Sequence, residues 1–222
     1  METRVKILVL FYSLTGQTVK LAKYIAEGAR EIEGIDVSVK QVPEIYPESY
    51  FQEHEHLAKA RENFKDMPVA TIDDLLEADG VAFGTPVHFG SFAAQLKHFI
   101  DGLTPVYVKG TMVGKPAALF TSAGSMHGGE EVALLSLMIP LLNLGMIPVG
   151  VPYPIQGEGP DFDSGSPYGA IFVSGHHGEK ELSEGDIKVA KILGKRLAGL
   201  SKVIKHGCQN LPECQFLSSK LE

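Results

Sequence analysis

The sequence predicts an α/β fold in which an open, doubly wound parallel sheet lies between two layers of helices. Two observations carry this prediction. Apolar runs alternate along the chain with amphipathic stretches, as in repeated strand–helix–strand units. Three of the apolar runs also end in turns rich in Gly, Ser and Thr, at the strand ends where open parallel sheets bind ligands. We therefore expect five parallel strands in the order 2-1-3-4-5, with helices on both faces.

The strands are expected where the apolar runs are densest. They are predicted at residues 4–11, 36–42, 80–84, 115–121 and 146–151. The second run alternates polar with apolar residues, as a strand at a sheet edge does. Helices are predicted at 17–33 and 73–78, from about 92 to Gly102, at 130–144, and from a cap at Ser183 with Asp186 at its third position to about Val203. Residues 43–70 are expected to be irregular or locally helical.

Size and composition indicate one ordinary globular domain. The chain has 222 residues, of which 44% are hydrophobic and 21% charged. We expect a single domain at residues 1–204 and a C-terminal tail at 205–222. The net charge of −7 argues against a nucleic-acid partner, because no basic block exists to neutralise a phosphate backbone.

The cellular location is expected to be the cytoplasm. The sequence starts with Met1-Glu2-Thr3-Arg4, which is no signal peptide, and no apolar run approaches the ~20 residues that span a bilayer. Cys208 and Cys214 are then expected to be free thiols, with a local disulfide as the alternative. The Gly- and Pro-rich stretch from Pro152 to Tyr168 is expected to be a functional loop.

The first turn has the chemistry of an anion site. It follows the first strand, opens a helix, and reads Ser13-Leu14-Thr15-Gly16-Gln17-Thr18. A helix N-terminus presents unpaired N–H groups, the hydroxyls add donors, and Gly16 allows close approach. The glycines of a dinucleotide fingerprint and the lysine of a P-loop are missing, so we expect a phosphate monoester held by neutral donors. The alternative is an ordinary first helix capped by Ser13 or Thr15.

Two later turns are expected beside the first. They run from Gly84 to Ser91 and from Ser122 to Glu130. Their small residues let the backbone lie against a flat ring and bond its edge, as a flavin requires. His88 and His127 are candidate proton donors in these turns, and each could instead be an exposed loop residue. The sequence Gly-His-His-Gly at 175–178 is interpreted as a turn, and no metal site is expected.

The ordered set of motifs resembles the WrbA-type NAD(P)H:quinone oxidoreductases of the flavodoxin-like superfamily. The resemblance spans roughly residues 4–200. It is carried by the first turn and by Pro68–Thr71, Phe83–Pro86, Phe89-Gly90, Thr121–Gly124 and Ser166–Ala170. It implies a three-layer flavodoxin-like fold that binds FMN, takes hydride from NAD(P)H and reduces a quinone by two electrons. It also implies a homodimer or homotetramer in which neighbouring subunits contribute to each active site.

The resemblance assigns site residues when it is carried over position by position. The FMN phosphate would be held by Ser13, Leu14, Thr15, Gly16, Gln17 and Thr18. The ring would be bordered by Pro86, Val87, His88, Phe89 and Gly90, and its pyrimidine side by Ser122, Ala123, Gly124, Ser125, Met126 and His127. Tyr107 falls where the family has an aromatic residue in the substrate pocket, and Asn143 where it has a flavin-contacting histidine.

The chain departs from the family pattern at several of these positions. Thr15 replaces an aromatic residue, His88 stands where arginine is usual, and the third turn is one residue longer. The sequence does not distinguish NADH from NADPH.

The sequence thus predicts an FMN-dependent oxidoreductase that passes hydride from NAD(P)H to the flavin and two electrons on to a quinone. Two alternatives keep the flavin. One is a flavodoxin-like one-electron carrier that docks partners through an acidic surface. The other is a reductase of azo, nitro or metal-oxyanion acceptors. A regulatory protein without flavin is a further alternative from another class.

Overall fold

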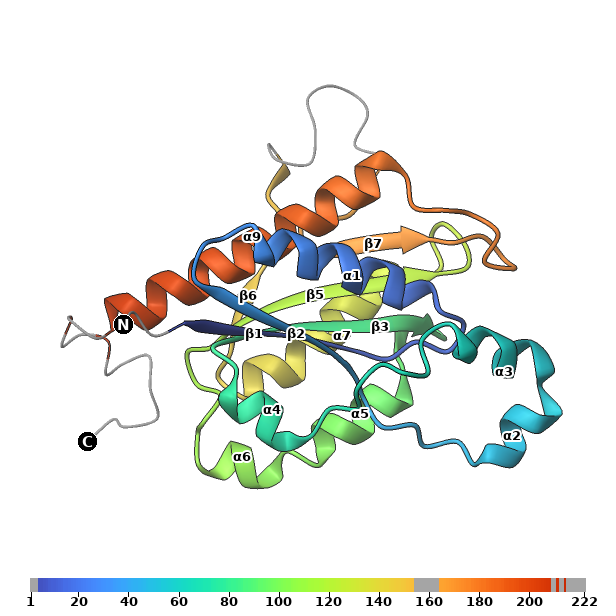
Figure 1. The fold of residues 1–222 in the computed structure, drawn as a ribbon, viewed down its shortest axis with the longest axis horizontal. Helices are drawn as coiled ribbons and strands as arrows, with labels where there is room; N and C mark the ends of the chain where they lie inside the picture. Colours follow the sequence, from blue (N-terminus) through green and yellow to red (C-terminus); the bar gives the residue numbers. More distant parts are fainter. Residues whose placement is uncertain (1–3, 154–163, 209–210, 212–213, 215–222) are drawn as a thin grey trace.

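The central sheet has the five predicted strands in the predicted order. The structure is a computed structural model that describes residues 4–153, 164–208, 211 and 214. The sheet lies between two helical layers (Figure 1). Its parallel strands are β2 (Ile35–Gln41), β1 (Val5–Phe11), β3 (Gly80–His88), β5 (Pro116–Ala123) and β6 (Ile147–Val149), in that spatial order.

Alternate side chains of β1 enter two separate cores. Val9 and Phe11 pack under α1 (Gln17–Arg30) and α9 (Glu184–Gly207). Leu8 and Leu10 point to the other face. That face is covered by α4 (Ile72–Glu77), α5 (Ala94–Asp101), α6 (Thr104–Val108) and α7 (Glu130–Asn143) (Figure 1). Because both faces are covered, the strand reads in the sequence as a continuous apolar run.

The last position of the sheet is divided between two short strands. β6 pairs with the amino half of β5, whereas β7 (Ala170–Val173) pairs in parallel with its carboxyl half. The sequence did not predict β7, because four residues are too few to show a period. The Gly- and Pro-rich stretch from Pro152 to Tyr168 connects the two strands, and its residues 154–163 lie outside the described residues.

The second turn is shorter than predicted. β3 continues past Gly84 to His88 and returns through Phe89 and Gly90 to the short antiparallel strand β4 (Ser91–Phe92). Two threonines extend the strand order beyond Gly84. Thr121 Oγ1 donates to the carbonyl of Thr85 at 2.7 Å, and Thr85 Oγ1 accepts the N–H of Ala93 at 2.8 Å. These bonds keep residues 85–88 in the sheet, whereas the sequence predicted a loop there.

The helices outside the sheet layers agree only partly with the sequence. Residues 43–70 contain α2 (Glu48–Glu53) and α3 (Glu55–Glu62), as the expectation of local helix allowed, whereas α6 was not predicted. The capping box of α9 is confirmed, with the N–H of Ser183 donating to Asp186 at 2.9 Å and the N–H of Asp186 donating to Ser183 Oγ at 3.1 Å. No helix of the described part of the chain is long and apolar enough to cross a bilayer.

The C-terminal end of α9 corrects two expectations. The helix continues beyond Val203 to Gly207, because no glycine or proline lies between these two residues. Cys208 and Cys214 form a disulfide, so the expectation of free thiols is wrong. Their Cα atoms lie 5.0 Å apart, within the range that a disulfide spans, and this proximity overrides the argument from compartment. Residues 209–210, 212–213 and 215–222 of the predicted tail lie outside the described residues, and the boundary at 204 stays a prediction.

Two glycines allow α1 and α9 to cross at very short range. A Cβ atom on Gly28 would lie 2.0 Å from the carbonyl oxygen of Lys191, and one on Gly194 would lie 2.0 Å from that of Ile25. Both obstacles are backbone atoms of the opposing helix, which cannot move without separating the helices. This crossing holds α1, and therefore the first turn that precedes it, against the sheet.

The crossing can be tested with a matched pair of glycine substitutions in α9. Gly194→Ala should lower the free energy of unfolding by about 1–3 kcal/mol, the usual cost of overpacking. Gly199→Ala should raise it by about 0.5–1 kcal/mol, because nothing lies within 4 Å of a Cβ there and alanine favours a helix. Urea unfolding measures both values. Equal effects of the two substitutions would contradict the close crossing.

Candidate functional site

The carboxyl ends of the strands enclose a cavity of about 610 Å³ at the switch between β1 and β3. Each of the three turns singled out in the sequence contributes to its wall. The contributing residues are Leu14, Thr15 and Gln17 from the first turn, Pro86, Val87 and His88 from the second, and Ser122, Ala123 and Gly124 from the third. The predicted convergence of the three turns is therefore present in the fold.

The first turn leaves the N-terminus of α1 open to an anion. Gly16 adopts a left-handed conformation with φ of 84° and caps the helix without any side-chain hydrogen bond. The first helical turn carries no acidic residue. The alternative that Ser13 or Thr15 caps this helix is therefore wrong. Unpaired N–H groups and the positive end of the helix dipole remain available to a phosphate.

Two buried hydroxyl groups of the first turn differ in their hydrogen-bond partners. Ser13 Oγ is buried and has no hydrogen-bond partner among the described residues. Thr18 Oγ1, also buried, bonds Ser122 Oγ at 2.8 Å and so joins the first turn to the third. A buried hydroxyl without a partner costs free energy unless a ligand satisfies it. Ser13 therefore fits a turn that accepts an oxygen-rich ligand.

The second and third turns touch through glycine. A Cβ atom on Gly129 would lie 2.8 Å from the Cα of Gly90, so neither turn could approach as closely with a larger residue at Gly129. Gly129 also has φ of 103°, which L-residues rarely adopt. This contact fixes the spacing between the two turns that the resemblance assigns to the ring.

His88 stands at the floor of the cavity on a rigid base. Its ring meets the edge of the Tyr12 ring, with centroids 6.5 Å apart. Tyr12 donates its hydroxyl to Glu44 at 3.0 Å, and Gln95 Nε2 donates to the same carboxylate at 3.0 Å. Burial, and then the charge of Glu44, raise the pKa of Tyr12 well above its usual value, so the phenol stays protonated.

Burial also determines the charge of His88. Desolvation lowers the pKa of the imidazole below its ordinary value, because no anion nearby compensates the charged form. At neutral pH the ring is therefore neutral, with one nitrogen that donates and one that accepts. Such a group can orient a carbonyl or hydroxyl of a ligand without adding charge to the cavity.

A fourth turn completes the wall; the sequence predicted this turn at 175–178 but not its place in the cavity. It comprises Ser174 to Gly178 and follows β7. Ser174 Oγ donates to the carbonyl of Ala123 at 3.1 Å, and Gln17 Nε2 donates to the carbonyl of Gly178 at 3.4 Å, so the turn is attached to the third and first turns. Its position at the carboxyl end of a parallel strand was the signal that could have shown this place, had β7 been predicted. His56 and Ala60 of α3 close the remaining side.

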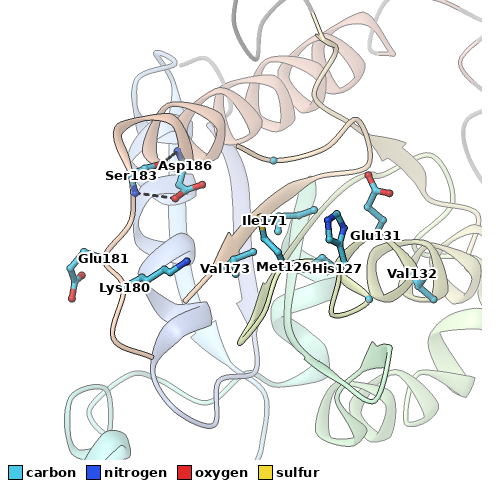
Figure 2. Close-up of a pocket in the computed structure, with 13 residues that line it drawn as sticks. Met126, His127, Glu131, Val132, Ile171, Val173, Lys180, Glu181, Ser183 and Asp186 are labelled. Atoms are coloured by element: carbon cyan, nitrogen blue, oxygen red, sulfur yellow. Dashed lines mark hydrogen bonds between the residues drawn. The ribbon is translucent and has the colours of Figure 1, made fainter. Parts of the chain in front are cut away.

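Other predicted site residues lie outside this cavity. Met126 and His127 line a second cavity of about 680 Å³, which Figure 2 shows between the third turn, β7 and the start of α9. Phe89 is fully exposed with φ of 50°. Ser125 and Gly90 belong to the turns but line neither cavity. The roles that the resemblance gives these residues stay predictions.

The second cavity has the wrong charge for a phosphate. Its wall contains one lysine, Lys180, against four carboxylates. They are Glu130, Glu131, Glu181 and Asp186. The two at the start of α7 already occupy the N-terminal end of that helix, whose dipole favours negative charge. A further anion would meet repulsion here, whereas the cavity at the β1–β3 switch contains no carboxylate among its lining residues.

Tyr107 and Asn143 lie far from the cavity of their own chain. Tyr107 is exposed on α6, which lies at the lower side of the molecule in Figure 1, away from α2 and α3. Asn143 ends α7, which begins at the third turn and has 14 residues, so about 20 Å separate its two ends. Within one chain these two residues do not line the cavity. They can serve the predicted roles only in the cavity of a second copy.

Comparison with known proteins identifies the family. Residues 5–161 match the family described as NADPH-dependent FMN reductase. The chain belongs to this family.

Curated relatives of this FMN reductase family member extend over nearly the whole chain. The NAD(P)H dehydrogenase (quinone) of Geotalea uraniireducens is 38% identical over 198 residues, which cover 88% of this chain and 97% of that protein. The protein of the same name from Aromatoleum aromaticum is 38% identical over 204 residues, covering 91% and 98%. The resemblance to the quinone oxidoreductases is therefore confirmed.

Solved structures of low identity confirm the fold. A flavodoxin, WrbA-like protein from Agrobacterium tumefaciens matches with a TM-score of 0.58 and 21% identity, over 89% of this chain and 98% of that one. A flavodoxin from the domain Archaea matches with a TM-score of 0.57 and 19% identity, over 89% and 99%. The predicted three-layer flavodoxin-like fold is confirmed.

Proposed function

We propose that this chain is an FMN-dependent NAD(P)H dehydrogenase (quinone) that acts in the cytoplasm. The observation that carries the proposal is the cavity at the β1–β3 switch, in which an uncapped helix N-terminus stands beside two turns of small residues. Membership of the FMN reductase family and the names of its curated relatives support the same activity.

The residues of the cavity fit FMN. The N–H groups at the start of α1, with the hydroxyl of Ser13, would hold the phosphate, since all are donors without partners. The backbone at Pro86–His88 and Ser122–Gly124 would border the ring. When bound, FMN supplies the chemistry, accepting hydride from NAD(P)H and returning two electrons to a quinone.

The chain itself positions the reactants and fixes their electrostatics. The Thr18–Ser122 bond and the Gly90–Gly129 contact hold the three turns at a constant spacing. Neutral His88 offers a donor to a quinone oxygen or to the ring edge. No side chain has to act as a nucleophile, so the absence of a cysteine or a lysine from the described wall of the cavity is consistent with this activity.

The activity is tested by rapid mixing of the FMN-loaded protein. NADH or NADPH should bleach the flavin absorbance, and benzoquinone should restore it with a stoichiometry of one quinone per flavin. Stopped-flow absorbance measures both half-reactions. Bleaching without reoxidation by quinone would favour another acceptor, such as an azo or nitro compound. Failure of both nicotinamides to bleach the flavin would favour the electron carrier.

The phosphate role of Ser13 has a signature that separates binding from folding. Ser13→Ala should weaken FMN binding by about 1.5–3 kcal/mol, the range for a hydrogen bond to a charged group. It should leave riboflavin affinity and the free energy of unfolding of the apoprotein nearly unchanged, because the hydroxyl has no partner in the described chain. Fluorescence titration measures the affinities, with Ser136→Ala on α7 as the control. Equal loss of FMN and riboflavin binding would exclude a phosphate contact.

We further propose that the protein is a homodimer or homotetramer whose subunits share their cavities. An apolar face runs along α7, where Val132, Leu135, Ile139 and Leu142 are exposed. The hairpin that carries the exposed Phe89 lies against the same helix, with Ser91 Oγ 3.4 Å from Ser136 Oγ. A second copy seated on this face would bury these side chains and could bring Tyr107 or Asn143 toward a neighbouring cavity.

The association face is tested by a single charge. Ile139→Lys should reduce the molar mass in solution, measured by light scattering, because it places a charge in the centre of the apolar face. Val203→Lys on α9 is the matched control, since Val203 is 68% exposed and Ile139 62% exposed, yet only Ile139 belongs to the face. A monomeric wild-type protein, or an equal effect of both substitutions, would contradict this mode of association.

A further inference from the structure

The cavity at the β1–β3 switch is unusual in its ionisable groups. Among the described residues that line it, the titratable side chains are histidines alone. They are His56, His88, His176 and His177, which are four of the eight histidines in the chain. The described wall therefore contains no permanent charge of either sign, in a protein whose net charge is −7.

The four histidines lie at two levels. His88 is half-buried on the floor and neutral. His56, His176 and His177 also line the cavity and are exposed to solvent, which places them at its mouth. The rings of His176 and His177 are 4.8 Å apart, close enough to serve one ligand group together. Within the described residues the histidines do not form a cluster that could hold a metal ion.

Imidazoles at a cavity mouth suit a phosphate ester. Imidazole is the side chain whose charge ordinarily changes between pH 5 and 8, and its protonated form donates from both nitrogens. We propose that His56, His176 and His177 form a proton-dependent site for a phosphate or pyrophosphate group of a nucleotide ligand, at the mouth of the cavity. The identity of that ligand rests on the proposed function, whereas the anion chemistry does not.

The surroundings determine how this site responds to pH. Glu179 accepts the backbone N–H of His177 at 2.9 Å, and backbone N–H groups lower the pKa of this carboxyl, so it stays charged. With the histidines neutral, Glu179 and the negative net charge repel an anion; with them protonated, the mouth attracts it. Other titratable groups that neighbour these histidines in the sequence are Lys180 after the fourth turn and Glu53, His54, Glu55 and Lys59 around His56. His88 lines the same cavity.

Two ligands of the proposed reaction carry the required group. Gln17 at the start of α1 donates a hydrogen bond to the carbonyl of Gly178, so the fourth turn lies beside the place proposed for the FMN phosphate. The exposed position of the histidines equally suits the pyrophosphate of a nicotinamide dinucleotide that enters from solvent. Both are phosphate esters, and the experiment distinguishes them.

The anion site is tested first without flavin. Inorganic pyrophosphate is titrated into the apoprotein at pH 5.5 and 8.0 while the histidine ring protons are followed by NMR. The dissociation constant should be about tenfold lower at pH 5.5, as expected for one imidazole whose pKa rises by about one unit on binding. The double variant His176→Gln/His177→Gln should lose this difference, and His98→Gln, an exposed histidine of α5, should keep it. Because pyrophosphate itself takes up protons, variants are compared at the same pH.

The source of the phosphate is tested next. If FMN supplies it, the double variant should lose the pH dependence of FMN binding, with riboflavin unaffected. If the dinucleotide supplies it, the variant should lose the pH dependence of KM for NADH in the FMN-loaded protein, with kcat preserved. Unchanged pyrophosphate binding in the double variant, or the absence of both effects, overturns the proposal. A protein that binds pyrophosphate through these histidines but shows no reduction by NAD(P)H would refute the proposed function and leave the anion site intact.

Discussion

Burial of β1 on both faces is the constraint on which the site depends. Leu8 and Leu10 fill one core, Val9 and Phe11 fill the other, and β2 and β3 occupy both edges. From Ile7 to Phe11 the strand is entirely apolar and buried, so at its carboxyl end polar groups first appear at the first turn. The parallel register places the ends of β3 and β5 at the same edge, and the glycine crossing of α1 with α9 holds the helix that receives the anion. The fold thus concentrates donors at one place because every other surface of the central strands is covered.

Much of this arrangement could be predicted from the sequence, for a physical reason. Apolar runs predict the five main strands, and the sequence from Ser13 to Thr18 predicts the first turn. Both are local signals. β7 has four residues, and the hairpin at Phe89 depends on two hydrogen bonds, one that Thr121 donates to Thr85 and one that Thr85 accepts from Ala93. Such features are determined by tertiary contacts, so a local pattern does not show them. The turn at 175–178 was predicted, but without β7 the sequence did not place its histidines at the site.

The side chains that line the cavity at the β1–β3 switch carry no permanent charge, either in its deep part or at its mouth. The deep part offers only hydroxyl and backbone donors with a neutral His88, which suits a flat ring and a phosphate bound at a helix end. The mouth carries side chains whose charge depends on pH. A permanent cation would attract anions at every pH, and the chain places none among the described lining residues. The cavity at the start of α9 differs in charge, because the carboxylates in its wall repel an anion.

Two residues to which the family resemblance assigns contacts, Tyr107 and Asn143, do not line the cavity of their own chain. The same resemblance expects neighbouring subunits at each active site. The exposed apolar face of α7 runs from the third turn, which borders the cavity, to Asn143, which does not line it. An assembly formed through this face would therefore link substrate access to association, because the surface that is costly to leave in water is also the surface that borders the site.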